Sequence, residues 1–542
     1  MSLPDRNNPY SFDEFLEWRN AVDFLNDDPF LLAAIDYFAP PFHPSVRADL
    51  DAFAERLSSR WQHLADVAGR PENAPSLMHF DGHNNRIDRI VRPAEALELE
   101  REIWHDGMFS EKADSWGTFV KTFLLAQLGE AGVGCAHCCT SGLILILERF
   151  ADTPELRDIL NHLKEGKDGE FAIGAQFLSE IQGGSDVQAN RVEAVQTAGG
   201  WRIYGTKFYC SAAHADYAII TAKPTGSRDV AAFVVPSWLP GDKARERRNG
   251  FVINKLKSKL GTRELPSAEI TFGGALAYPV GDLKRGLANI VGIVLAHSRF
   301  ATGLGAGAYL VRASREARRY ATWRTAFGAT IDRFGLVRRQ LDEIDQGAKR
   351  IIASGFKMQR ELVELGELDR AEIPSDDEVA EKKRRFRLRM LVMLHKLVVS
   401  ADSARLTETA MSIFGGHGLM EDFSSIPRIY RDAVVLNGAW EGPRNLLLTR
   451  IFMDMQRAAA RWYPTTEFVA DLLPDTARET QRALGDRLKW ILAFESLVAD
   501  NPATLEICDR WDTICGEIFH AYQDAAVAEL VTHTPKLLKI LD

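Results

Sequence analysis

The spacing of apolar residues changes along the chain. Through residues 1–170 apolar side chains recur every three or four positions, in stretches such as SFDEFLEWRNAVDFL and AEALELEREIW, and this spacing predicts amphipathic helices. Through residues 171–282 the period shortens to two, in runs such as WRIYGTKFY and AEITF, which predicts a compact antiparallel β domain. Helical spacing returns through 283–453 and continues through 454–542. We therefore predict an α+β chain with an N-terminal helical domain, a middle antiparallel β domain, a C-terminal helical bundle and a helical C-terminal extension.

Composition and charge narrow the classes of function. The chain has 542 residues, of which 46% are hydrophobic and 26% charged, as expected of a globular protein with several domains. Its formal net charge of -9 disfavours binding to nucleic acid, which requires clustered Lys and Arg. No apolar run approaches the roughly 20 residues that span a bilayer, and the first residues do not resemble a signal peptide. We expect a cytoplasmic protein without a membrane partner.

Three of the six cysteines crowd into one segment, GVGCAHCCTSG, together with His137. Six cysteines are too few for a disulfide framework in a chain of this length. A metal site is one interpretation of the segment. Glu130, Cys138 and Cys139 would lie on different helix faces, however, and no second pair of ligands follows at a suitable spacing. The segment is therefore expected to be a tightly packed helix, and no metal is predicted.

A single carboxylate stands out in LNGAWEGPRNLLLTR, residues 436–450. Glu441 lies beside Trp440 and Gly442, and no other charged residue occurs between Asp432 and Arg444. A poorly solvated carboxylate has a raised pKa, which suits a group that takes up and returns a proton. Glu441 is thus a candidate base, and an ion-paired or exposed glutamate is the alternative interpretation.

Three glycine-rich segments are candidates for binding an anion. FAIGAQFLSEIQGGSDVQAN offers Gly183 and Gly184 with nearby hydroxyl groups, and could hold a pyrophosphate or be an ordinary turn. IFGGHGLMEDFSSIPRIYRD adds Arg428 and Arg431, which would serve a phosphate or structural ion pairs. The third, GLGAG, lies inside a helical pattern without a preceding strand, which indicates helix packing. The charge-dense segment ELDRAEIPSDDEVAEKKRRFRLR is expected to be a solvated loop and the start of a helix.

Several of these segments together resemble one family. LSEIQGGSD is similar to the signature of the acyl-CoA dehydrogenases, KFYCSAAHADYAII to their second flavin loop, RTAFGATIDRF to their R-x-x-F-G segment, and FGGHG with WEG to their adenine-contacting and catalytic segments. The WEG and QGGSDV forms, the stretch HFDGHNNRIDRIVRP and the C-terminal extension resemble the AidB-like branch. The resemblance implies the acyl-CoA dehydrogenase fold and a bound FAD.

The resemblance also assigns roles to residues. Glu441 lies at the position of the catalytic base, and Arg299 at that of an arginine close to the base. Substrate contacts fall on Ser185, Gly442 and Glu130, where Glu130 would be a polar end of the acyl pocket or simply a packed or solvated glutamate. The flavin-contacting positions are Gln176, Leu178, Ser179, Gly184, Ser185, Tyr209, Ser211, Arg324, Phe327, Gly415, Gly416 and Asn445. Four of these, Arg324, Phe327, Gly415 and Gly416, match residues that reach the FAD of a neighbouring subunit, so a homodimer or homotetramer is implied.

The function that the resemblance implies is FAD-dependent α,β-dehydrogenation of an acyl-CoA, with the α-proton passing to Glu441, the β-hydride to flavin N5, and the electrons to an electron-transfer flavoprotein. The alternatives are an AidB-like, DNA-associated flavoprotein of alkylation protection, and a flavin oxidase that uses oxygen directly. The extension, residues 454–542, has 15 Asp or Glu against 9 Lys or Arg, which disfavours DNA. Three departures from the family pattern, Pro443, Ala296 and Gly335, weaken the assignment of flavin contacts and of substrate.

Overall fold

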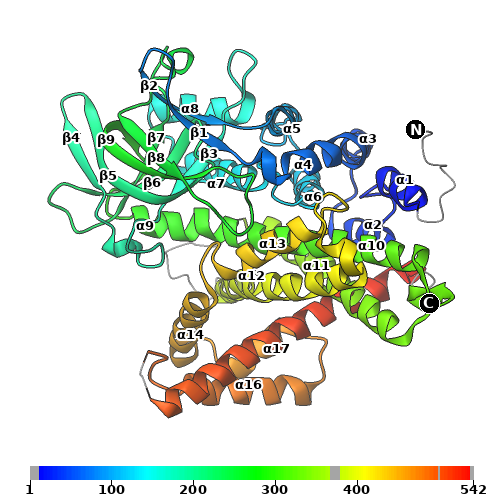
Figure 1. Ribbon diagram of the computed structural model, residues 1–542. Helices are drawn as coiled ribbons and strands as arrows, with labels where there is room; N and C mark the ends of the chain where they lie inside the picture. The colour runs from blue at the N-terminus through cyan, green and yellow to red at the C-terminus, as the bar shows by residue number, and fades with distance from the viewer. Residues whose placement is uncertain (1–10, 367–378, 499–500, 538–542) are drawn as a thin grey trace, which may run out of the picture.

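The computed structural model describes residues 11–366, 379–498 and 501–537, with a β-rich part packed beside a larger helical part (Figure 1). The loop predicted from the charge-dense segment falls on residues 367–378 and lies outside the described residues. The helix expected after it is present as α12 (Val379–Ile413). The α+β fold class predicted from the apolar spacing is confirmed.

The first section is largely helical. Its helices are α1 (Asp13–Ala21), α2 (Pro29–Phe38), α3 (Pro44–Arg56), α4 (Gln62–Ala68), α5 (Ala94–His105), α6 (Ser115–Ala126), α7 (Gly134–Phe150) and α8 (Pro154–Glu165). Side-chain caps explain where two of them begin. Asp114 accepts a hydrogen bond from the backbone N–H of Gly117 at 2.7 Å at the start of α6, and Thr153 caps α8 ahead of Pro154.

A β-hairpin interrupts this helical section, which corrects the expectation that residues 1–170 are helical throughout. Strand β1 (Ser76–Phe80) pairs antiparallel with β2 (Arg86–Val91). The turn between them is stabilised by Asp81, whose carboxylate accepts hydrogen bonds at 2.8 Å from the N–H groups of His83 and Asn85. Asn84 adopts a φ of 66°, a conformation that Asn tolerates better than most residues. Local turn chemistry therefore overrides the helical spacing on either side.

The middle section forms one seven-stranded sheet. Its strands are β3 (Gly174–Phe177), β4 (Glu193–Thr197), β5 (Gly200–Ser211), β6 (Tyr217–Pro224), β7 (Ala231–Pro236), β8 (Phe251–Leu256) and β9 (Ser267–Pro279). The order β3-β6-β4-β5-β9-β7 closes on itself because β7 also pairs with β6, and β8 pairs with β9. Most pairings are antiparallel as predicted, but β3 and β4 each run parallel to β6. Strand direction is set by these chain crossings, which the alternation of side chains does not encode.

Long helices form the third section. They are α9 (Gly286–Asn289), α10 (Leu295–Trp323), α11 (Gly335–Leu365), α12, α13 (Ile426–Gly438) and α14 (Arg444–Arg461), with a short hairpin, β10 (Thr325–Ala326) and β11 (Ala329–Thr330), between α10 and α11. The GLGAG segment lies inside α10 and allows close packing, as its pattern indicates. A Cβ atom on Gly307 would approach Ile351 of α11 to 2.2 Å, and one on Gly303 would approach His395 of α12 to 2.3 Å.

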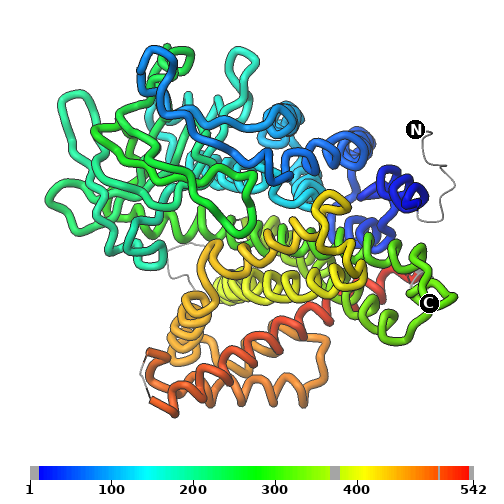
Figure 2. The backbone as a smooth tube through the Cα atoms, viewed as in Figure 1, coloured from blue at the N-terminus to red at the C-terminus, as the bar shows by residue number. Residues whose placement is uncertain are grey.

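The C-terminal extension adds α15 (Thr465–Leu472), α16 (Arg478–Leu492) and α17 (Pro502–His533). Figure 2 shows it, in orange and red, as a further helical layer on the bundle. Helix α17 packs against α11 and α12. The buried Trp511 anchors it by donating a hydrogen bond from Nε1 to the carbonyl of Leu448 at 3.0 Å. Lys357 and Glu529 add an ion pair at 2.8 Å.

Within the described residues, one helix passes a length and apolarity test for a membrane span, the continuous helical stretch Gly286–Trp323. Its main part, α10, packs against both α11 and α12, and most of its apolar side chains are buried there. A core helix of a helical bundle has the same composition. The test therefore gives little support to a membrane span here.

Candidate active site

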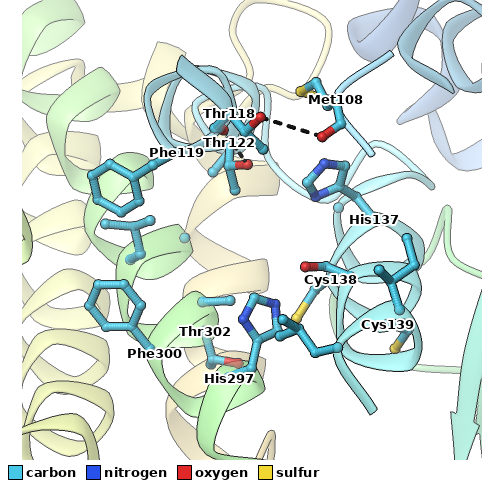
Figure 3. A pocket seen from close by; sticks show the side chains of 18 of the residues that line it. Met108, Thr118, Phe119, Thr122, His137, Cys138, Cys139, His297, Phe300 and Thr302 are labelled. Carbon is cyan, nitrogen blue, oxygen red and sulfur yellow. Dashed lines mark hydrogen bonds between the residues drawn. The ribbon is translucent and has the colours of Figure 1, made fainter. Parts of the chain in front are cut away.

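A cavity of about 1040 Å³ lies among α6, α7, α10 and α11, and Trp440 and Glu441 from the turn between α13 and α14 also line it. Figure 3 shows two contrasting walls. Phe119 and Phe300 stand on one side, with nearly parallel rings whose centroids are 6.2 Å apart. His137 and Cys138 stand on the other side. The volume suits a ligand of the size of a long acyl chain.

Glu441 is held at this cavity by a strained turn. Its φ is 56°, and Gly442 follows with a φ of 111° that only glycine adopts easily. Arg299 donates from Nε to the carbonyl oxygen of Glu441 at 3.2 Å, and Lys396 donates from Nζ to the carbonyl oxygen of Gly442 at 2.9 Å. The predicted neighbour Arg299 thus fixes the backbone of the candidate base.

The electrostatics of Glu441 combine burial with two cations. Burial raises the pKa of its carboxyl above the ordinary value, while the positive charges of Arg299 and Lys396 oppose that rise. Burial also lowers the pKa of Lys396 to about 8. A carboxyl group whose pKa is raised above the ordinary value is suited to taking up and returning a proton during a reaction.

Lys396 was not predicted from the sequence. It follows His395 within an apolar run of α12, MLVMLHKLVV. A lysine in such a run is rarely buried unless its charge is paired or has a function. This isolated charge is the feature of the sequence that could have indicated a role for Lys396. Nothing in the sequence paired it with Glu441, because the contact depends on how α12 lies against the turn after α13.

Glu130 lines the same cavity and is fully buried. Both of its carboxylate oxygens lie 3.2 Å from the N–H of Cys135, and its own N–H donates to Asp432 at 3.3 Å. Burial and the nearby carboxylate of Asp432 raise the pKa of Glu130 well above its ordinary value. The interpretation of Glu130 as a solvated glutamate is therefore wrong. Its role as the polar end of a substrate pocket stays a prediction, with a packed glutamate as the alternative.

The two predicted flavin loops lie side by side. Gln176 is in β3, and Leu178, Ser179, Gly184 and Ser185 follow it in the next loop, while Tyr209 and Ser211 end β5. The N–H of Phe208 donates to the carbonyl of Ser179 at 2.9 Å, and the buried Lys207 donates to that of Leu178 at 3.2 Å. Gln176 also reaches Ser298 of α10, at 3.4 Å. The loops thus meet next to the part of α10 that carries Arg299.

The other flavin-contacting candidates lie elsewhere. Arg324 and Phe327 belong to the hairpin after α10, and Gly415 and Gly416 to the short helix η8 (Gly415–Leu419). Arg324 follows Arg299 by 25 positions along α10, which corresponds to about 37 Å. In Figure 1 this hairpin lies at the end of α10 remote from the sheet. A hydrogen bond of 2.9 Å between Tyr320, near the end of α10, and His417 connects this end of α10 to η8. Asn445 is exposed in the first turn of α14.

Contacts decide one further alternative that the sequence left open, the role of two arginines. Arg428 is buried and pairs with Asp66 at 3.3 Å, and Arg431 pairs with Glu421, so these arginines form structural ion pairs rather than a phosphate site. In the described part of the chain, no group of three or more His, Cys, Asp or Glu side chains is arranged to hold a metal ion. Of the departures, Ala296 lines the cavity, Pro443 precedes α14, and Gly335 begins α11.

Comparison with known protein families shows two matches along the chain. The family model "Acyl-CoA dehydrogenase, middle domain" matches residues 175–275, and "Acyl-CoA dehydrogenase, C-terminal domain" matches residues 284–456. The chain belongs to the acyl-CoA dehydrogenase family. This family consists of FAD-dependent oxidoreductases. The resemblance seen in the sequence is therefore confirmed, and so is the cofactor class of the family.

Among curated relatives, acyl-CoA dehydrogenase family member 11 of Caenorhabditis elegans is 29% identical over 84% of this chain and 74% of its own length. The putative acyl-CoA dehydrogenase AidB of Escherichia coli is 29% identical over 71% of this chain and 70% of its own length. Both relatives extend beyond the segment that the two family models match. They agree with the AidB-like branch predicted from the sequence.

Two solved structures share the fold. ACDH-11 of Caenorhabditis elegans in complex with C11-CoA superposes with a TM-score of 0.77 at 24% identity, covering 94% of this chain and 88% of the other. An acyl-CoA dehydrogenase of Bacillus anthracis complexed with FAD gives 0.68 at 17% identity, covering 94% and 86%. The coverage includes most of the C-terminal extension as well as the family core.

Proposed function

We propose that this protein dehydrogenates an acyl-CoA thioester between its α and β carbons, with Glu441 as the base that removes the α-proton. The observation that carries the proposal is the position of Glu441, whose carboxyl lines a cavity of about 1040 Å³ and has a raised pKa. The ion-paired or exposed glutamate that the sequence left open is disfavoured, since no hydrogen bond or ion pair among the described residues engages the carboxylate itself.

The residues around Glu441 support the proton step. The carboxylate accepts the α-proton while the Cα–Cβ double bond forms. Arg299 and Lys396 bind the two carbonyl groups of the turn, so the carboxylate is presented to the cavity from a fixed backbone. Their charges oppose the rise that burial causes in the pKa of Glu441.

The chain also fits the cofactor of its family. FAD, when bound, supplies the acceptor for the β-hydride. The candidate flavin loops present open backbone at Gly183 and exposed ring surface at Tyr209, which is 38% exposed with Lys257 5.5 Å from the ring centroid. Ile181 in the same loop is 80% exposed. Exposed apolar and aromatic surface beside a Gly-Gly-Ser turn suits a flat ring system with a pyrophosphate.

We propose further that the site is completed by a second copy of the chain, as a homodimer or homotetramer. Arg324 and Phe327 lie just past the end of α10 that is remote from the sheet with Tyr209, and Gly415 and Gly416 lie in η8, which the Tyr320–His417 hydrogen bond joins to that same end. Phe327 is 98% exposed, and nothing lies within 4 Å of a Cβ placed on Gly415 or Gly416. Such open surface is suited to contact with the cofactor of a neighbouring subunit.

For the onward transfer of electrons we propose an electron-transfer flavoprotein, as the family resemblance implies. The alternative of DNA association is disfavoured by the extension. Its net charge is -6, and a surface that binds the phosphate backbone needs the opposite sign.

Anaerobic mixing with a panel of acyl-CoAs tests the function. The expected result is bleaching of the oxidised flavin band by at least one thioester, with formation of the enoyl-CoA. A panel that leaves the flavin oxidised throughout contradicts dehydrogenation. A second mixing with oxygen or with an electron-transfer flavoprotein then separates oxidase from dehydrogenase.

A further inference from the structure

The cavity has a polar wall that the proton step does not use. His137 of α7 and His297, in α10, both line it, and the hydroxyl groups of Thr118 and Thr122 stand beside His137 in Figure 3. Both hydroxyls donate to backbone carbonyls, at 3.4 Å and 2.8 Å, and keep their lone pairs as acceptors. Phe119 and Phe300 form the opposite, apolar wall.

His137 is a fixed ring without a polar partner. Its side chain is 5% exposed, and its Nε2 atom is buried with no hydrogen-bond partner among the described residues. Phe109 packs against the ring with centroids 4.8 Å apart, and Trp104 meets it edge-on at 6.2 Å. Packing on two aromatic rings holds the imidazole in place, although no hydrogen bond specifies its orientation.

His297 adds a second imidazole close to the first. Burial lowers the pKa of His297 to about 4, and burial together with the charge of His297 lowers the pKa of His137 to about 4. Both rings are therefore neutral near pH 7, and each offers one N–H donor and one nitrogen acceptor. No hydrogen bond to a described residue is formed by the His297 ring either, so two imidazoles in the cavity wall have hydrogen-bonding capacity that the described residues do not use.

An unsubstituted alkyl chain is a poor match for this wall. Filling the cavity with it would leave the polar atoms of two imidazoles unpaired, which weakens binding by about tenfold for each group so stranded. A carboxylate on the chain is also a poor match, because both imidazoles are neutral near pH 7 and Glu441 lines the same cavity. A neutral oxygen substituent both accepts and, as a hydroxyl, donates a hydrogen bond.

We propose that the acyl group of the substrate carries a hydroxyl or ketone oxygen beyond its β carbon, and that His137 and His297 are the residues that select it. The proposal rests on the acyl-CoA dehydrogenase function proposed above and names the class of acyl group for that site. Neither histidine is placed in the proton-transfer machinery. Both are specificity residues, so their replacement changes the choice of substrate rather than the chemistry.

The test compares matched thioesters on the FAD-loaded protein. Undecanoyl-CoA, the chain length bound in the ACDH-11 structure, is compared with hydroxyundecanoyl-CoAs whose hydroxyl lies at successive carbons beyond Cγ. Binding is measured by calorimetry, and flavin reduction by rapid mixing. We expect at least one hydroxylated thioester to bind about tenfold more tightly than the plain one. His137→Phe keeps an aromatic ring against Phe109, and it should abolish most of that preference while binding plain undecanoyl-CoA at least as well as the wild type.

Phe119→Leu on the apolar wall is the matched control, since it should weaken both thioesters to the same extent. Equal binding of all thioesters by the wild type overturns the proposal. So does equal weakening of all of them in His137→Phe, which would assign the histidine to the pantetheine arm of CoA. If the binding preference is found but no thioester reduces the flavin, the inference about selectivity stands and the dehydrogenase function falls.

Discussion

At the scale of single residues, the sequence drew attention to Glu441 because it was the lone charge in an apolar segment, and the family resemblance placed Arg299 beside it. The contact between Arg299 and the Glu441 carbonyl agrees with that placement. Lys396, His137 and His297 were not singled out as site residues, although His137 lay in a segment that was considered for metal binding. Their roles depend on which face of α7, α10 or α12 lines the cavity, and that is decided by helix packing rather than by local spacing.

Replacing Lys396 with Met tests the electrostatic part of the site. Loss of the cation removes one of two charges that oppose the raised pKa of Glu441, so that pKa should rise further. Since the base must be deprotonated to act, the acidic limb of the pH profile for flavin reduction should move to higher pH. Lys396→Arg retains the charge and should leave the limb near its original position. An unchanged limb in Lys396→Met would mean that Lys396 does not influence the base.

At the scale of elements, the period of apolar residues predicted the α, β, α order, because burial of one face dominates long helices and sheet strands. The period of apolar residues did not predict features that depend on local turns or on chain crossings. The hairpin β1–β2 depends on the Asp81 and Asn84 turn, and the parallel runs of β3 and β4 against β6 depend on chain crossings. The GLGAG segment was predicted correctly, because a glycine inside a helical pattern has a packing reason when no strand precedes it.

Two glycines of α10 give a matched test of that packing. Gly307→Ala places a Cβ at 2.2 Å from Ile351 and should destabilise the protein by about 1–3 kcal/mol, as overpacking does. Gly305→Ala meets nothing within 4 Å and should stabilise the helix by roughly 0.5–1 kcal/mol. Denaturant unfolding of both variants checks the signs. Equal effects of the two substitutions would contradict the close approach of α10 and α11.

At the scale of the whole molecule, the domain boundaries and the assembly remain predictions. A homo-oligomer would bring the hairpin after α10 against the flavin loops of a neighbour.

Phe327→Asp places a charge on a side chain that is 98% exposed in the single chain. If it is buried at a subunit contact, this variant should dissociate and lose FAD, which light scattering and the flavin content of the purified protein measure. Val498→Asp in the extension is the matched control, because Val498 is 80% exposed and lies away from the hairpin in the sequence. Leu336 is 76% exposed but lies in the adjoining helix α11, so Leu336→Asp is not a suitable control. A Phe327→Asp protein that keeps the assembly and its flavin would contradict the shared site.

The central claim, that Glu441 removes the α-proton, is tested most directly by the rate of flavin reduction in Glu441→Gln. The amide keeps the size of the side chain but accepts no proton, so reduction by a saturating acyl-CoA should slow by at least ~100-fold. Binding of the matching enoyl-CoA, followed through its perturbation of the flavin spectrum, should persist and show that the site is intact. Reduction at a rate close to that of the wild type would contradict the claim and would assign the proton to another base.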